Sequence, residues 1–298
     1  MAGYTDGWQE LSVDMTIPAG ATEAFFRLYN GMQGGSGRKV YWDNLSVTEI
    51  VAPFGPAWSG GATGGAAEAD YTTVTLPEPS LAQVNTIDGG WITFAKNPDG
   101  VSYTPEPGSE GMVLAKVGNA YRLTELDGTV TEFTAQSGIW AATSSWTPES
   151  VSTTRYLYDT AGSRLLLKKV INPVEPGVDD TNNCTTAIPA RGCEVLEYEY
   201  ATTTSPGLSQ TVFGDYTDRV SGVKLWTWDP NTSAMTAAQT AKYAYDNLGQ
   251  LREVWDPRVT PPLKTTYEYT GGRVSKATPA GELPWQFDYG NPDLVSCA

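Results

Sequence analysis

The stretch of residues 243–257, with the sequence YAYDNLGQLREVWDP, predicts a β-hairpin. Its two tyrosines, Tyr243 and Tyr245, are two residues apart, so in an extended strand their rings leave the same face. The DNLG segment predicts a turn, because Asx side chains bond the nearby backbone and Gly249 accepts positive φ. Residues 251–255 form the expected return strand, which ends at Pro257 because proline donates no ladder hydrogen bond.

The same pattern of aromatic-x-aromatic, turn, apolar strand and proline recurs along the chain. A single hairpin of this kind is marginally stable alone, so repeated hairpins are expected to bury their aromatic rings against one another. Weaker copies begin at Tyr198 and Phe287, and the sequence around Trp226 looks like the end of a degenerate one. The expected core residues of the repeats are Tyr156, Tyr158, Gly162, Tyr198, Tyr200, Tyr243, Tyr245, Gly249, Tyr267 and Tyr269.

This set of repeats resembles the tyrosine-aspartate (YD) repeat of Rhs proteins, a family that includes teneurins and the cocoon subunits of insecticidal toxin complexes. The copies at Tyr156 and Tyr243 match the pattern, the copy at Tyr267 lacks the aspartate, and the copy at Tyr198 lacks both aspartate and turn glycine. The resemblance covers residues 86–298. It implies a hollow β-shell that encloses a C-terminal cargo, often a toxin, in a secreted or cell-surface bacterial protein.

Residues 4–50 carry a second resemblance. The order W-x-x-L-x-V, I-P-A-G-A, F-R-L-Y and V-Y-W-D-N-L-S-V is similar to the C-terminal half of a galactose-binding-like jelly roll, as in carbohydrate-binding modules. Asp43 is a candidate calcium ligand. The alternative is that Asp43 forms part of a turn or a bulge, which is the more frequent role of an Asp-Asn pair in such a strand. The candidate sugar-stacking residues are Trp8, Tyr29, Tyr41 and Trp42. The alternative is a core role, which is the more frequent one for aromatic residues on β-strands.

The expected fold is therefore all-β in three parts. Residues 1–52 form part of a β-sandwich, residues 53–83 form a linker rich in Gly, Pro and Ala, and residues 84–298 form a coiling antiparallel sheet of hairpins. Within the last part, the Asp127–Gly128 dipeptide between two alternating segments predicts a further hairpin.

Cys184 and Cys193 bracket an eight-residue segment inserted between two repeats. In an extracellular β protein, two cysteines that close a short loop indicate a disulfide. The alternative is a pair of unrelated reduced thiols. A zinc site is disfavoured, because two thiolates without histidine supply half of its ligands. Cys297 is left over, and we expect any partner for it to lie beyond this sequence.

Composition excludes several classes of function. The formal charge of −15 argues against nucleic acid and anionic membranes as partners. The absence of histidine excludes Ser-His-Asp and Cys-His nucleophilic sites and every histidine-ligated metal. No apolar run is long enough to span a bilayer, and no signal peptide precedes Tyr4, so we expect a fragment of a longer secreted chain.

Catalysis is not expected either. Six aspartates could in principle pair as glycosidase carboxylates, but all stand beside Gly, Asn or Pro or in turn segments, which favours turn formation: Asp88, Asp99, Asp127, Asp159, Asp246 and Asp256. The sequence thus predicts a non-enzymatic structural segment whose partner is the remainder of its own polypeptide. The alternative is adhesion to surface glycans through residues 1–52.

Overall fold

A computed structural model describes residues 54–55, 58, 70–87, 90–148, 153–161, 164–175, 177–206 and 212–289. All of them belong to one compact unit, residues 46–298. Several residues singled out above lie outside the described part of the chain: Trp8, Tyr29, Tyr41, Trp42, Asp43, Asp88, Gly162 and Cys297.

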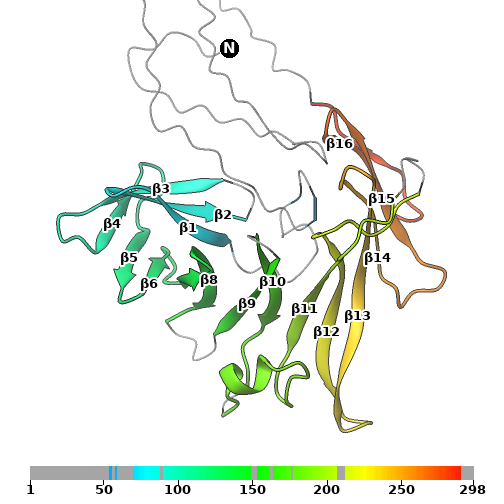
Figure 1. The fold of residues 1–298 in the computed structure, drawn as a ribbon, viewed down its shortest axis with the longest axis horizontal. Coiled ribbons are helices and arrows are strands. Elements are labelled where there is room, and N and C mark those ends of the chain that lie inside the picture. The colour runs from blue at the N-terminus through cyan, green and yellow to red at the C-terminus, as the bar shows by residue number, and fades with distance from the viewer. Residues whose placement is uncertain are drawn as a thin grey trace, which may run out of the picture. The chain divides into compact units, whose positions relative to one another are not determined.

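The described residues form an antiparallel sheet of 17 strands (Figure 1). A short π-helical segment, η2 (Asp180–Cys184), interrupts the strand order between β10 and β11. The strands are β1 (Tyr71–Glu78), β2 (Leu81–Thr86), β3 (Trp91–Lys96), β4 (Ser102–Pro105), β5 (Val113–Val117), β6 (Ala120–Thr124), β7 (Val130–Gln136), β8 (Ile139–Trp146), β9 (Thr154–Ala161), β10 (Arg164–Ile171), β11 (Val195–Tyr200), β12 (Val220–Asp229), β13 (Ala234–Tyr245), β14 (Leu251–Trp255), β15 (Lys264–Thr270), β16 (Arg273–Thr278) and β17 (Trp285–Gln286).

The first eight strands close into a barrel. Each pairs with the next, and β1 also pairs with β8, with Thr73 opposite Ala141 and Val74 opposite Trp140. Closure removes the free edges that an open sheet exposes. Alternate residues point inward and are fully buried, among them Val84, Phe94, Leu114, Leu123 and Phe133.

The remaining strands extend this sheet from β8 in chain order, so that β9–β14 lie side by side (Figure 1). Four of the expected hairpins are present as β9/β10, β11/β12, β13/β14 and β15/β16. The return strand expected at residues 251–255 is β14. The all-β class and the antiparallel sheet predicted from the sequence are thus confirmed.

The expected boundary between linker and sheet is wrong. Strand β1 and the start of β2 fall within residues 53–83, which composition assigned to a linker. The β-branched run Thr72–Thr75 favours a strand, but the neighbouring Gly and Ala residues dominated the composition of the window. Phe54 also belongs to the core, with 1% of its surface exposed and its ring centroid 5.0 Å from that of Tyr243.

Beyond β9 the sheet has two chemically different faces. The tyrosine face carries the paired aromatic residues, which join the same core cluster as the interior of the barrel. The charged face carries the residues between them, because neighbouring residues of a strand point to opposite sides. Ion pairs on that face join Lys168 to Glu197, Lys224 to Glu199, Lys264 to Glu253, and Lys276 to Glu268.

Candidate functional site

The four hairpins from β9 to β16 share a β-bulge at the same point of the repeat. In each hairpin the register shifts next to the second tyrosine, and one residue of the return strand is paired with no residue of the first strand. The residues paired with Tyr158, Tyr200, Tyr245 and Tyr269 are Leu167, Val220, Leu251 and Val274, and the extra residues are Lys168, Ser221, Arg252 and Ser275.

The hydroxyl of each second tyrosine reaches back to the hairpin before it. It donates to the backbone carbonyl of the residue that pairs with the second tyrosine of that earlier hairpin. The bonds run from Tyr200 to Leu167 at 3.0 Å, from Tyr245 to Val220 at 2.7 Å, and from Tyr269 to Leu251 at 2.8 Å. We call this series the tyrosine ladder. It ties each hairpin to its predecessor through a side chain as well as through the strands.

The tyrosine ladder begins one hairpin earlier than the sequence pattern shows. The hydroxyl of Tyr158 donates to the carbonyl of Ala142 at 2.7 Å. Ala142 pairs with Phe133, and the register shifts between Glu132 and Phe133 as it does in the later hairpins. The hairpin β7/β8 is therefore a copy with Phe133 in the second aromatic position. Sequence reasoning missed it because Thr131 stands where the first aromatic residue is expected.

The bulge gives the tyrosine hydroxyl its acceptor. A bulge interrupts the regular ladder of backbone bonds, and a buried carbonyl without a partner is costly. Tyr245 is fully buried, and its hydroxyl bond satisfies the carbonyl of Val220 within the core. Burial raises the pKa of Tyr245, Tyr200 and Tyr158 well above the usual value of tyrosine. These groups therefore remain neutral donors.

The aspartate that follows the two tyrosines of the β13/β14 hairpin stabilises the turn of that hairpin. Asp246 accepts hydrogen bonds from the amides of Leu248 and Gln250 and from Nε of Arg252, the last at 2.8 Å. The Arg252 guanidinium also donates to the carbonyl of Tyr267 and lies 5.1 Å from the ring of Tyr269. One buried ion pair thus joins the turn, the bulge and the next hairpin.

A segment near the start of the described chain covers the last hairpins on the tyrosine face. Trp58 donates its indole N–H to the hydroxyl of Tyr269 at 2.6 Å, and its ring lies 4.6 Å from that of Tyr267. A Cβ on Gly55 would lie 2.4 Å from the carbonyl oxygen of Gly249, so only glycine permits this approach. Of the first tyrosines in the repeats, Tyr156, Tyr198 and Tyr243 are buried and Tyr267 is half-buried.

The insertion between β10 and β11 forms a small second core on the charged face. Cys184 and Cys193 are joined by a disulfide, as the sequence predicts. They pack with Ile171 and Val195. Lys169 lies beneath the insertion and donates to the carbonyl of Thr186 at 2.7 Å, and burial lowers the pKa of its ammonium group.

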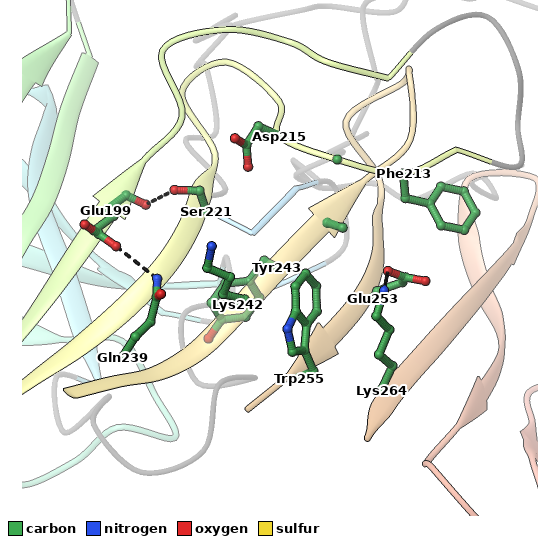
Figure 2. Close-up of a pocket in the computed structure, with 12 residues that line it drawn as sticks. Glu199, Phe213, Asp215, Ser221, Gln239, Lys242, Tyr243, Glu253, Trp255 and Lys264 are labelled. Carbon is green, nitrogen blue, oxygen red and sulfur yellow. Dashed lines mark hydrogen bonds and ion pairs between the residues drawn. The ribbon is translucent and has the colours of Figure 1, made fainter. Parts of the chain in front are cut away.

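The charged face also holds a shallow depression of about 230 Å³ (Figure 2). Glu199 lies on one side, where it pairs with Lys224 at 2.5 Å and accepts a bond from Gln239 at 3.1 Å. On the other side Glu253 pairs with Lys264 at 2.6 Å. The lining residues are Glu199, Phe213, Gly214, Asp215, Ser221, Gln239, Lys242, Tyr243, Ala244, Glu253, Trp255 and Lys264.

The acidic side chains act mainly in structure. The carboxylates of Asp99, Asp127 and Asp256 accept backbone amides of their own turns, which confirms the turn-forming role expected from the sequence. The expectation is wrong for Asp159, which lies within strand β9 opposite Leu166 and accepts the amide of the next strand residue, Thr160. A hydrogen bond from Arg258 holds the pKa of Asp256 at about 2. In the described ranges, no cluster of three or more His, Cys, Asp or Glu side chains is arranged to hold a metal ion.

Within the part of the chain that the structure covers, no helix has the length and apolar character needed to cross a bilayer.

No family model matches the chain, and no curated protein matches it. Among solved structures, the N-terminal domain of the effector protein SpvB from Salmonella typhimurium is 14% identical, with 75% of this chain and 100% of that chain covered and a TM-score of 0.41. A porin-like protein from Bacteroides uniformis is 12% identical, with coverage of 68% and 90% and a TM-score of 0.23.

Proposed function

We propose that this chain is a non-enzymatic structural segment of a large secreted or cell-surface protein of the Rhs (YD-repeat) type. In that role it forms part of a β-shell that encloses or presents a C-terminal, toxin-like cargo. The tyrosine ladder supports this proposal, because it repeats one interaction over successive hairpins and so builds an extended wall from short units. The disulfide fits an oxidising compartment.

The chemistry of the two faces supports the same role. The tyrosine face is apolar and takes part in a continuous core, whereas the charged face carries its acids and bases in cross-strand pairs. Paired surface charges contribute little to stability, but they keep a long sheet soluble. Three members of these pairs, Glu199, Glu253 and Lys264, line part of the depression on the charged face. A wall needs a stable sheet and a solvated surface, and both are built here by repetition.

The test uses the full-length polypeptide that contains this chain. We expect its C-terminal portion to resist chymotrypsin, and we expect Tyr245→Ala to make that portion accessible by breaking the tyrosine face. Lys276→Ala, on the exposed charged face, is the matched control and should leave resistance unchanged. Equal accessibility of the C-terminal portion in all three proteins would contradict enclosure.

The same proteins address the alternative of surface adhesion. If residues 1–52 bind glycans, binding to a glycan array should be lost in Trp42→Ala while the protease resistance of the C-terminal portion is retained. Array binding with that sensitivity would establish adhesion, and it would favour adhesion over the shell if the C-terminal portion is also equally accessible in the parent and Tyr245→Ala proteins.

A further inference from the structure

The depression on the charged face lies along a row of paired residues that crosses five strands. Directly opposite residues of neighbouring antiparallel strands have their side chains next to each other on one face. A Cβ at Gly222 would lie 2.4 Å from Nε2 of Gln239, so glycine at this position leaves room within the row. From β11 to β15 the row consists of Glu199, Gly222, Lys242, Trp255 and Lys264.

Two hydrogen-bond donors in the middle of this row have no acceptor among the described residues. The lysines on either side, Lys224 and Lys264, each pair with a glutamate, but the Lys242 ammonium group forms no ion pair or hydrogen bond within the described ranges. The indole N–H of Trp255, the residue directly opposite Lys242, also donates to no described group. Figure 2 shows the indole nitrogen on the side of Lys242 and the ammonium group pointing toward Asp215.

Asp215 is the unpaired anion of the same depression. Backbone bonds fix its position, because Gly214 exchanges two hydrogen bonds with Tyr245, at 3.0 and 2.7 Å, and the Asp215 carbonyl accepts the amide of Ser205 at 2.8 Å. The Asp215 side chain is exposed, and its carboxylate binds no side chain or amide in the described part of the chain. A cation and an anion thus line one depression without reaching each other.

We propose that this depression binds a small zwitterion, an α-amino acid with an apolar side chain. Lys242 and the indole N–H of Trp255 hold its carboxylate, Asp215 accepts its ammonium group, and the rings of Trp255 and Phe213 contact its side chain. Both ends then form charge-assisted hydrogen bonds. The volume of about 230 Å³ is smaller than the roughly 300–1,000 Å³ of pockets for drug-sized ligands, which suits a single amino acid. The site does not depend on whether the sheet encloses a cargo.

The test is a titration of the intact chain with L-phenylalanine and L-leucine, followed by saturation-transfer difference NMR. Two analogues of phenylalanine each lack one charge: phenethylamine has no carboxylate, and hydrocinnamate has no ammonium group. We expect both analogues to bind about tenfold more weakly than L-phenylalanine, because each loses a hydrogen bond between charged groups. Lys242→Met should remove the preference for L-phenylalanine over phenethylamine, and Asp215→Asn should remove the preference over hydrocinnamate.

Lys276→Met is the matched control, because Lys276 lies on the same face but pairs with Glu268 outside the depression. It should bind all ligands as the parent does. Both site variants should keep the melting temperature of the parent, so that a change in preference reports the site and not unfolding. Equal affinities of L-phenylalanine and its two analogues, or an unchanged preference in either site variant, would overturn the recognition of a zwitterion. No binding of either amino acid would overturn the site itself.

Discussion

The barrel of β1–β8 and the open sheet of β9–β17 hold their strands together in different ways. The barrel pairs its first and last strands, so every strand has two neighbours and the interior is filled by side chains such as Phe94 and Leu114. The open sheet has no such closure among its described strands. It interrupts each hairpin with a bulge and fastens the bulge to the next hairpin with a tyrosine hydroxyl.

The difference explains why the second aromatic position of the repeat holds tyrosine in the open sheet and phenylalanine in the barrel. Phe133 and Tyr245 occupy the same position of the repeat, and both are fully buried. Phe133 faces β6, which pairs with β7 in an unbroken register. Tyr245 faces Val220 beside a bulge, where a carbonyl accepts its hydroxyl. The second aromatic position is therefore occupied by tyrosine where the preceding hairpin provides a backbone carbonyl that accepts the hydroxyl.

The largest effect should come from alkaline pH. Burial raises the pKa of Tyr198 and Tyr269 to about 12, and that of Tyr158, Tyr200 and Tyr245 further. Below pH 10 these tyrosines are protonated in both the folded and the unfolded state. Above pH 10 they ionise first in the unfolded chain, so the free energy of unfolding falls as the pH rises.

Circular dichroism melts between pH 8 and pH 12 measure this loss, and tyrosinate absorbance should rise with unfolding rather than before it. A melting temperature that is constant through pH 12 would contradict the burial of the tyrosine face.

The next largest effect is expected for Tyr245→Ala. The ring is fully buried and its hydroxyl bonds Val220, so truncation leaves a cavity and an unpaired carbonyl. The free energy of unfolding should fall by about 3–5 kcal/mol, as for other large aromatic truncations. Urea denaturation measures the change. If the tyrosines formed an exposed ligand-stacking surface instead, the variant would melt like the parent.

Sequence patterns predicted the hairpins of the open sheet better than the barrel. The aromatic-x-aromatic spacing, the Asp246 turn and the disulfide are local features, and each is formed within a short stretch. The barrel instead depends on the pairing of Val74 with Trp140, which are far apart in sequence. Thr-rich alternation in β1 carries no information on which distant strand it will pair with.

The tyrosine ladder was also beyond sequence reasoning, although its tyrosines were identified. The partners of the hydroxyls are backbone carbonyls, which every residue type supplies, and the bulges have no common residue type among Lys168, Ser221, Arg252 and Ser275. Phe54 and Trp58 were assigned to a linker because the residues that they contact, Tyr243 and Tyr267, lie about 200 residues later in the sequence.

Removal of the disulfide should have an intermediate effect that is confined to the insertion. Replacing Cys184 and Cys193 by Ala should lower the free energy of unfolding by about 2–3 kcal/mol on the chain-entropy estimate for a loop of this length. Free-thiol assays on protein made in an oxidising compartment provide the complementary measurement. Two free thiols in the parent protein would refute the disulfide.

A smaller effect is expected at turn glycines, and it should differ between the two regions. Gly249 in the open sheet has φ of 73°, and a Cβ there would meet the Tyr216 ring at 3.1 Å. Gly118 in the barrel has φ of 60° but open space around it. Valine at either position should cost more than about 1 kcal/mol through backbone strain, with the greater loss at Gly249. Equal melting of Gly249→Val and the parent would contradict the turn.

The hydroxyl bond itself is tested most directly by the unfolding free energy of Tyr245→Phe measured beside that of Tyr267→Phe. Both variants keep the ring, but the Tyr245 hydroxyl bonds the Val220 carbonyl, whereas that of Tyr267 makes no hydrogen bond to the described residues. Loss of the bond should leave a buried carbonyl unsatisfied and cost about 1–3 kcal/mol in Tyr245→Phe, against less than about 0.5 kcal/mol in Tyr267→Phe. Equal stabilities of the two variants would contradict the tyrosine ladder as the device that joins the hairpins.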